Sequence, residues 1–354
     1  MLYKELIKRG VPSFLPENTE KWPERRLEIV DMLQKYMYGY RPKECAITVE
    51  DAKPDPKYFA SKCTRYDVTI NCHLPEGDFR FPAVGVIPKS DKPVPAVVFI
   101  SFSDQVPYRN LPAEEITDNG IAVFSFFYKD VCPDHRDAMT EGELPLLLFG
   151  GKRNETDAGA ISMWAWAASR VLDWALTFDE IQKDNIAVVG QSRLGKTALF
   201  AGATDTRFAM AHSNESGCCG AAMSRGIKGE NFEAITDRFP HWFSTGFYKY
   251  AGKEQEFPYD QDALIAAICP RRVYVASASE DQCCDPDSEY LSAWSASRIW
   301  EMLGMDGLIG VNRYPKGGEV FNLGNVGYHQ RFGTHAMSRQ DWHNLMPFIL
   351  RKSR

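Results

Sequence analysis

One stretch of the chain, residues 186–201, has the pattern of a buried strand that turns sharply into a helix. Such a turn needs a small residue two positions before its serine, here Gly190, and it lifts the hydroxyl above the sheet edge beside the amides of the helix. The usual pattern has a second glycine two positions after the serine, whereas this chain has Leu194 there and Gly195 one position later. We interpret Ser192 as a nucleophile, with a structural turn serine as the alternative.

The composition allows a sizeable core, since 44% of the 354 residues are hydrophobic and 12% are aromatic. A dispersed net charge of −6 argues against nucleic acid or an anionic membrane surface as a partner. No run approaches about 18 apolar residues, and the first six residues lack the apolar core of a signal peptide. The nine cysteines form neither a C-x-x-C pair nor a metal spacing with histidine. We therefore expect a cytoplasmic enzyme with no metal and no other cofactor. The sequence makes no prediction of its oligomeric state.

The chain divides into an N-terminal segment and one larger domain. Residues 1–43 carry apolar positions at helical spacing and predict a helical extension. Residues 44–354 are expected to form a single catalytic domain. It is expected to open with an antiparallel pair of strands. Apolar and polar residues alternate at residues 64–70, and an apolar run occupies residues 81–88.

Strands and helices then alternate, which predicts an α/β domain with a doubly wound, mostly parallel sheet between two helical layers, the α/β-hydrolase fold. The loop at residues 103–105 lies where that fold supplies an oxyanion-hole amide. Residues 129–157 are polar and predict a long surface excursion near the site. Further strands are expected at residues 95–102, 121–128, 186–190, 208–215, 272–279 and near 308–314, and helices at 157–176, 288–303 and 338–350.

A serine nucleophile needs a histidine base and an acid that orients it, and in this fold the chain order is serine, acid, histidine. Three histidines follow the last acid-bearing strand. His343 falls inside the terminal helix pattern, where a packed or surface histidine is the better interpretation. His335 sits in a turn just before that helix and is preferred over His329, which is expected in a glycine-rich loop.

Two carboxylates can serve as the acid, and the choice stays open. Glu215 ends the strand after the nucleophile, and Asp281 follows the next predicted strand. Arg193 lies beside the serine and could aim at an oxyanion, where a preorganised donor is worth about 3–4 kcal/mol of barrier. Lys196, one helical turn on, could meet a carboxylate or hydroxyl of the substrate, or could be an ordinary surface lysine.

The segment Gly190–Lys196 resembles the Gly-Cys-Ser-Arg-x-Gly-Lys signature of the glucuronoyl esterases, carbohydrate esterase family fifteen. The likeness covers roughly residues 80–350, and the chain is identified as a bacterial-type member. Further motifs follow in the family's order at Asn214–Gly217, Ala221–Arg225, Arg238–Phe243, Phe257–Gln261, Ala267–Arg272 and Tyr328–His335.

The resemblance implies metal-free cleavage of the ester between 4-O-methyl-glucuronic acid on xylan and lignin alcohols. By position, Ser192 is the nucleophile and His335 the base. Glu215 matches the acid of the fungal triad and Asp281 a second acid of bacterial relatives. The resemblance makes the arginine after the serine the oxyanion donor and the lysine of the signature a contact to the uronate.

Two departures from the family pattern bear on specificity. Gln191 replaces the signature cysteine, so a disulfide of fungal members is absent, as in bacterial relatives. Family members often carry Asp-x-Trp-Ala-Asp-Pro after the acid-bearing strand, where this chain has Cys283 and Cys284 in place of Trp-Ala. Because that tryptophan packs on the sugar, its loss predicts weaker stacking.

The sequence therefore predicts a serine carboxylic-ester hydrolase acting through an acyl-enzyme on a small carbohydrate ester. The favoured substrates are 4-O-methyl-glucuronoyl esters, in imported uronate-bearing or acylated oligosaccharides. Acetylated xylo-oligosaccharides are the first alternative. A serine peptidase is a further alternative, but no propeller repeat or second domain supports it. A catalytically silent binding protein is the last, and the complete set of serine, acid and histidine argues against it.

Overall fold

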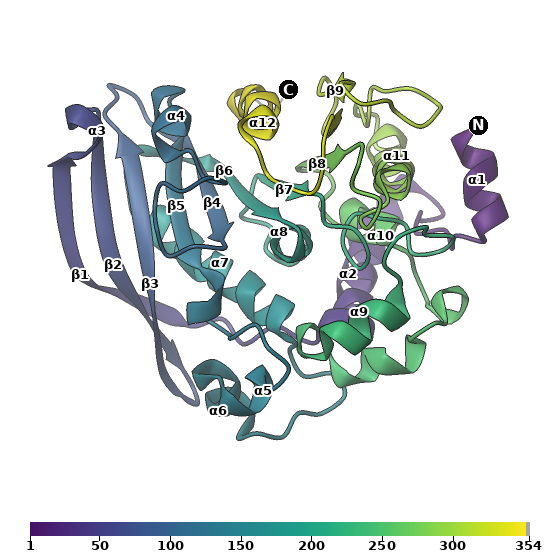
Figure 1. The fold of residues 1–354 in the computed structure, drawn as a ribbon, viewed down its shortest axis with the longest axis horizontal. Helices are drawn as coiled ribbons and strands as arrows, with labels where there is room; N and C mark the ends of the chain where they lie inside the picture. The colour runs from purple at the N-terminus through teal and green to yellow at the C-terminus, as the bar shows by residue number, and fades with distance from the viewer. Residues whose placement is uncertain (352–354) are drawn as a thin grey trace.

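The computed structural model describes residues 1–351. Its centre is a ten-stranded sheet in the order β1-β2-β3-β5-β4-β6-β7-β8-β10-β9 (Figure 1). The strands are β1 (Ala46–Lys57), β2 (Cys63–Leu74), β3 (Gly77–Pro88), β4 (Val94–Ser101), β5 (Ala122–Phe127), β6 (Ile181–Gln191), β7 (Met210–Asn214), β8 (Arg272–Ala278), β9 (Val320–Phe321) and β10 (Val326–Arg331).

Six neighbouring strands, from β5 to β10 in the sheet order, are parallel to one another. The strands β1, β2 and β3 form an antiparallel wing on one side, and β9 adds an antiparallel edge on the other. The predicted doubly wound, mostly parallel α/β sheet is confirmed. Because six carboxyl ends meet at one edge, loops that follow distant parts of the sequence converge there.

The helices cover both faces of this sheet (Figure 1). They are α1 (Leu2–Arg9), α2 (Trp22–Leu33), α3 (Tyr58–Ser61), α4 (Ala113–Asp118), α5 (Ala138–Glu141), α6 (Glu143–Phe149), α7 (Ala160–Ala175), α8 (Arg193–Thr204), α9 (Phe232–Arg238), α10 (Gln261–Ala266), α11 (Pro286–Met302) and α12 (Arg339–Leu350). Short helical turns are η1 (Thr19–Lys21), η2 (Gln34–Tyr38), η3 (Tyr128–Asp130), η4 (Pro240–Trp242), η5 (Thr245–Tyr250) and η6 (Glu254–Glu256).

Strand β4 shows why the core has two parts. All eight of its residues are buried, which explains its continuous apolar run. Because successive side chains of a strand point to opposite faces, Val98 belongs to the core beneath α7 and α8, whereas Phe99 packs with α4 and α12. The sheet is therefore the middle of three layers.

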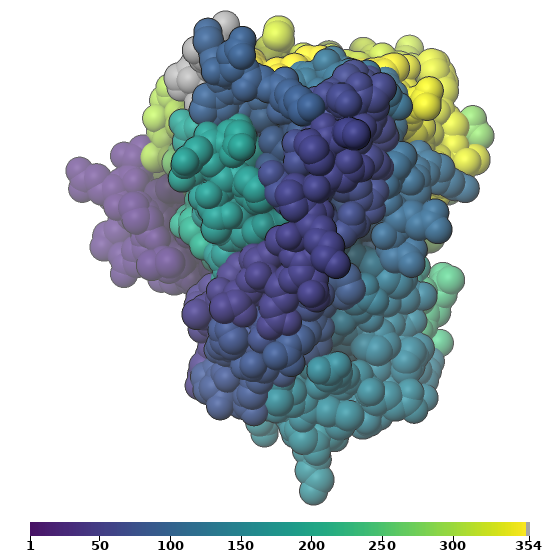
Figure 2. Space-filling model, turned by 90° about the vertical axis from the view of Figure 1, so that its left-hand side faces the viewer, coloured from purple at the N-terminus to yellow at the C-terminus, as the bar shows by residue number. Residues whose placement is uncertain are grey.

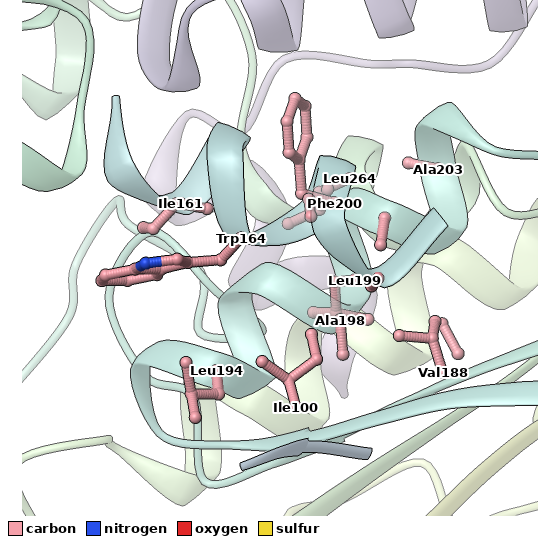
Figure 3. Packing of buried hydrophobic residues seen from close by; sticks show 14 of the residues in the cluster. Ile100, Ile161, Trp164, Val188, Leu194, Ala198, Leu199, Phe200, Ala203 and Leu264 are labelled. Carbon is pink, nitrogen blue, oxygen red and sulfur yellow. The ribbon is translucent and has the colours of Figure 1, made fainter. Parts of the chain in front are cut away.

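Helix α8 is fixed by its apolar contacts with neighbouring helices and strands (Figure 3). Its side chains Leu194, Ala198 and Leu199 lie in the same cluster as Trp164 of α7 and Val188 of β6. All five are fully buried. This packing holds the helix against the sheet and so fixes the position of its first residue.

The predicted N-terminal segment contains α1, α2 and the π-helical turn η2, as its helical pattern indicates. Arg9 attaches it to the larger part of the chain, since its Nη1 donates to the Arg225 carbonyl at 3.2 Å and to Ser288 Oγ at 2.8 Å. Figure 2 shows the purple N-terminal segment protruding beside the face formed by the dark blue first strands. The boundary at residue 43 stays a prediction.

Two details of the predicted chain path are wrong. The expected strand near residues 308–314 is absent, because the N–H and C=O of Val311 bond with the Tyr290 hydroxyl instead of a strand partner. The last parallel strand is β10, in a region expected to be loop, since the polar residues His329 and Arg331 hide its strand pattern. Among the described residues, no helix has both the length and the apolar character to cross a lipid bilayer.

Candidate active site

Ser192 occupies the sharp turn between β6 and α8, as the sequence predicts. Its backbone has φ 56° and ψ −129°, a conformation that a non-glycine residue adopts only under strain and that is typical of a nucleophile elbow. The Ser192 N–H donates to the Asn214 carbonyl at 2.8 Å, and its own carbonyl accepts from Gly195 at 2.8 Å. The serine therefore caps α8 and lies at the positive end of its dipole.

The neighbours of the serine explain the unusual glycine spacing. A Cβ atom on Gly190 would lie 2.0 Å from the Leu194 carbonyl oxygen, so no side chain fits there. Gly195 faces Ser213 and Ser216, at and just after the end of β7, and a Cβ atom on it would lie 3.1 Å from an atom of each. The close approach therefore requires glycine two before the serine and favours a small residue three after it, while Leu194 packs into the core.

His335 lies in the loop that follows β10, and both predicted acids reach its Nδ1 atom. Asp281 Oδ2 is 2.7 Å from Nδ1 and Glu215 Oε2 is 3.3 Å from it. Asn214 joins this loop to the elbow, since its Nδ2 donates to the Ala336 carbonyl at 3.2 Å and its backbone carbonyl accepts from the nucleophile's N–H. The structure thus brings the predicted base and both predicted acids together.

The two acids differ in their electrostatic surroundings. Burial raises the pKa of Asp281, but hydrogen bonds with His335 and Cys284 more than offset it, so its pKa lies below the usual value. Burial raises the pKa of Glu215 above its usual value, with the Arg331 guanidinium opposing that effect. Asp281 is therefore the stronger acid of the two as well as the nearer one.

Arg331, the last residue of β10, holds the histidine loop in place. Its Nη2 donates to the carbonyls of Thr334 and Ala336, on either side of the base, at 2.7 and 2.5 Å. The same atom donates to Glu215 Oε1 at 2.5 Å, and Nε donates to Asp341 Oδ2 at 3.0 Å. One guanidinium therefore ties the loop to the end of β7 and to α12.

The other two candidate histidines lie elsewhere. His329 is fully buried in β10, where Nε2 is 2.9 Å from Asp341 Oδ1 and Nδ1 is 3.0 Å from the Tyr274 hydroxyl. His343 is on α12 and pairs with Glu115. Of the three histidines weighed, His335 is the one that contacts Asp281 and Glu215.

Arg193 is fixed by a buried carboxylate that the sequence analysis left inside the polar excursion, Asp134. The guanidinium pairs with this carboxylate, which also accepts from His241 Nε2 at 2.8 Å and from Trp242 Nε1 at 2.7 Å. The Arg193 guanidinium lies 4.7 Å from the centre of a Trp242 ring. Arg193 Nε is buried and has no hydrogen-bond partner among residues 1–351, so the ion pair with Asp134 does not use all the N–H groups of the guanidinium.

Burial raises the pKa of Asp134, but the His241 hydrogen bond and the Arg193 charge more than offset it and hold the pKa well below its usual value. Asp134 is thus an ionised group inside the protein, and it neutralises the cation next to the nucleophile.

Lys196 is buried, which excludes the surface-lysine alternative. It is 4% exposed, its ammonium donates to the Ser216 carbonyl, and it lies 5.9 Å from a Trp242 ring centre. The predicted oxyanion loop offers less than expected, because the N–H groups of Ser103 and Gln105 already donate to Ser101 and Ser103 hydroxyls.

Three residues of this site were not predicted from the sequence: Asp134, Arg331 and Trp242. The last two lie in motifs of the family resemblance, so a signal for them existed. Asp134 lies in a stretch of mixed charges, and nothing in its sequence surroundings marks it.

The chain is similar in sequence and in fold to several known esterases. A family model described as fungal glucuronyl esterase matches residues 70–304, about two thirds of the chain. Carbohydrate esterase MZ0003, from an unknown prokaryotic organism, is 44% identical over 184 residues, 52% of this chain and 42% of that protein. A 4-O-methyl-glucuronoyl methylesterase of Podospora anserina is 28% identical over 298 residues, 80% of this chain and 56% of that protein. The chain spans about half the length of these curated relatives.

Solved structures superimpose more completely. A glucuronoyl esterase from Solibacter usitatus has a TM-score of 0.84 at 31% identity, over 96% of this chain and 98% of that chain. A promiscuous CE15 esterase from a marine bacterial metagenome has a TM-score of 0.84 at 29% identity, over 96% and 97% of the two chains. With both its sequence and its whole fold matched, the chain belongs to the glucuronoyl esterase family, carbohydrate esterase family fifteen.

Proposed function

We propose that this protein is a serine carboxylic-ester hydrolase whose substrates are small carbohydrate esters, above all 4-O-methyl-glucuronoyl esters. The observation that carries the proposal is the contact between His335 Nδ1 and Asp281 Oδ2 at 2.7 Å, at the sheet edge that also holds the strained Ser192. The family membership supports the choice of a uronate ester. The high thiol content fits the cytoplasm as the proposed location.

In the proposed reaction, Ser192 Oγ attacks the ester carbonyl carbon while His335 Nε2 accepts the hydroxyl proton. Asp281 stabilises the imidazolium that forms. The tetrahedral intermediate collapses with loss of the alcohol, to which His335 returns the proton, and an acyl-enzyme remains. A water molecule, deprotonated by the same histidine, then releases the uronic acid and regenerates the serine.

The negative oxygen of the intermediate needs a donor, and Arg193 is the proposed source. Its side chain is 26% exposed, and the anchoring of its guanidinium by Asp134 keeps it preorganised. Lys196 lies one turn further along α8, and its remaining N–H groups are the proposed contact to the sugar or carboxylate.

Acetylated oligosaccharides are the second candidate, because an exposed Cys283 stands where many family members carry a stacking tryptophan. The deciding experiment compares benzyl glucuronate with p-nitrophenyl acetate, using Ser192→Ala as the blank. A strong preference for the uronate ester supports the main proposal. Activity on acetate alone transfers the assignment to acetyl esters, and equal rates for Ser192→Ala and the unaltered enzyme refute the serine mechanism.

A further inference from the structure

A cysteine lies against the proposed catalytic pair. Cys284 Sγ is 3.6 Å from His335 Nδ1, and the Cys284 N–H donates to Asp281 Oδ1 at 3.3 Å. The sequence stretch that the family writes as Asp-x-Trp-Ala has cysteine at this last position, so the thiol is a departure from that pattern. The proposed hydrolysis does not use it.

The three side chains form a set of metal ligands of three different kinds. One ligand atom each from Asp281, Cys284 and His335 lies within 4.8 Å of the others. A carboxylate, a thiol and an imidazole together suit Zn²⁺, which accepts ligands of all three kinds. Spacing in the sequence did not reveal the set, because the first two residues are three positions apart and the third follows far along the chain.

One of the separations between ligand atoms already suits a tetrahedral zinc ion, and a second needs a small adjustment. With Zn–S of about 2.3 Å and Zn–N of about 2.0 Å, the sulfur and nitrogen ligands are about 3.5 Å apart, close to the separation of Cys284 and His335. The Asp281 oxygen at 2.7 Å from Nδ1 is too near and must retreat by about 0.6 Å, which a rotation of the carboxylate supplies. His335 is 41% exposed, so an ion can enter from its side.

The Asp281 carboxylate favours a cation at this place. Burial raises its pKa, but its hydrogen bonds with His335 and Cys284 more than offset that effect, so the pKa lies below the usual value and the group is charged at neutral pH. Burial raises the pKa of the Cys284 thiol well above its usual value, so the ion must displace the thiol proton. Thiolate and carboxylate then neutralise the two charges of the ion, and the thiol proton leaves to solvent.

We propose that Asp281, Cys284 and His335 bind Zn²⁺ and that the bound ion blocks ester hydrolysis. The ion takes the Nδ1 lone pair of His335, so the ring proton resides on Nε2. That nitrogen can then no longer accept the proton of Ser192, and Asp281 no longer orients the ring. The loss of turnover rests on the proposed function, whereas the binding of the ion does not.

Binding is tested with cobalt(II) added to the reduced protein, because thiolate ligation of this ion gives a near-ultraviolet charge-transfer band. Cys284→Ser removes the thiolate with little change of shape, and the exposed neighbour Cys283→Ser is the matched control. We expect one band that Zn²⁺ displaces, that Cys283→Ser keeps and that Cys284→Ser loses. A band that persists in Cys284→Ser, or no band in the unaltered protein, overturns the proposal.

Inhibition is tested with p-nitrophenyl acetate and with benzyl glucuronate, in a non-thiol reductant and with rising Zn²⁺. We expect Cys284→Ala to need about tenfold more Zn²⁺ for half-inhibition than the unaltered protein or Cys283→Ala. Equal sensitivity of Cys284→Ala and the unaltered protein overturns the inhibitory role. If neither ester is hydrolysed but the cobalt band behaves as expected, the proposed function fails and the metal site stands.

Discussion

Asp281, in the loop that follows β8, places its Oδ2 atom 2.7 Å from His335 Nδ1. Glu215 reaches the same nitrogen at 3.3 Å from the end of β7, and both of its oxygens already accept hydrogen bonds, from Arg331 and from the Ala336 N–H. In the proposed mechanism the nearer and more acidic carboxylate, Asp281, orients His335, and Glu215 fixes the loop that carries this histidine.

We expect Asp281→Asn to lower kcat by about a thousandfold, because the ring then loses the charge that fixes its tautomer. Glu215→Gln should cost about tenfold, the equivalent of one hydrogen bond. Steady-state kinetics on the better of the two esters measures both. A larger loss in Glu215→Gln than in Asp281→Asn would reverse the assignment, and equal partial losses would mean that the carboxylates share the role.

Arg331→Lys should lower kcat about tenfold or more while KM changes little, because a single ammonium cannot reach all the acceptors that the guanidinium joins. The rate at which a fluorophosphonate labels Ser192 should fall in parallel, since it also depends on the position of the base. Arg339→Lys, at an exposed position on α12, is the control. A rise in KM with unchanged kcat would contradict a positioning role.

Asp134→Asn should destabilise the protein by about 2–3 kcal/mol at pH 7. The side-chain NH₂ group of asparagine would face the N–H donors that the carboxylate now accepts from, and the negative charge would be lost. The folded-state pKa of this carboxyl is depressed, so its stabilisation is present above the unfolded pKa of about 3.9 and is lost as the pH falls through the folded value. Melting temperatures from pH 3 to 8 test this.

The difference in melting temperature between the unaltered protein and Asp134→Asn should be largest at neutral pH and should shrink below about pH 4. Asp137→Asn, an exposed position on the same excursion, should show no such gap. A gap that widens on acidification would show that the carboxylate is not the ionised partner of Arg193.

Gly190→Ala should cost more than about 3 kcal/mol, since its Cβ would overlap a backbone carbonyl. Gly120→Ala is the matched control, with φ +75° and open space around its Cβ, and should cost about 1 kcal/mol. Urea unfolding measures both. Similar costs would contradict the close approach as the reason for glycine at position 190.

Cys283→Trp should lower KM for benzyl glucuronate several-fold and leave KM for p-nitrophenyl acetate nearly unchanged. The side chain at this position is exposed, so an indole fits and can stack on a sugar ring. Gln282→Trp places the same ring one residue away as the control. An equal change for both esters would show that the new ring does not contact the sugar.

The elements that the sequence predicts well are those whose apolar pattern is uninterrupted. The runs that became β4 and α7 are buried almost throughout, so local pattern and tertiary contacts agree. Strand β10 was not predicted because its polar residues form hydrogen bonds with Tyr274, Asp341 and Glu215, contacts that no local pattern shows. The segment at residues 308–314 has the opposite fault, since it looks like a strand but its backbone bonds with a tyrosine hydroxyl.

The same reasoning applies to the site. Ser192 and His335 could be placed because a turn and a chain order mark them. The choice between Glu215 and Asp281 could not be made, since it depends on a difference of 0.6 Å at one nitrogen. Asp134 has no sequence signal at all, because its importance comes from partners that lie far along the chain.

The catalytic candidates are distributed over loops that follow four different strands of one rigid sheet. Natural variation can therefore change the length or the residues of one loop without disturbing the spacing of the others. The two cysteines after β8 are an instance, since they depart from the family's Trp-Ala in a loop that also carries Asp281. A lineage with this architecture can explore new esters one loop at a time.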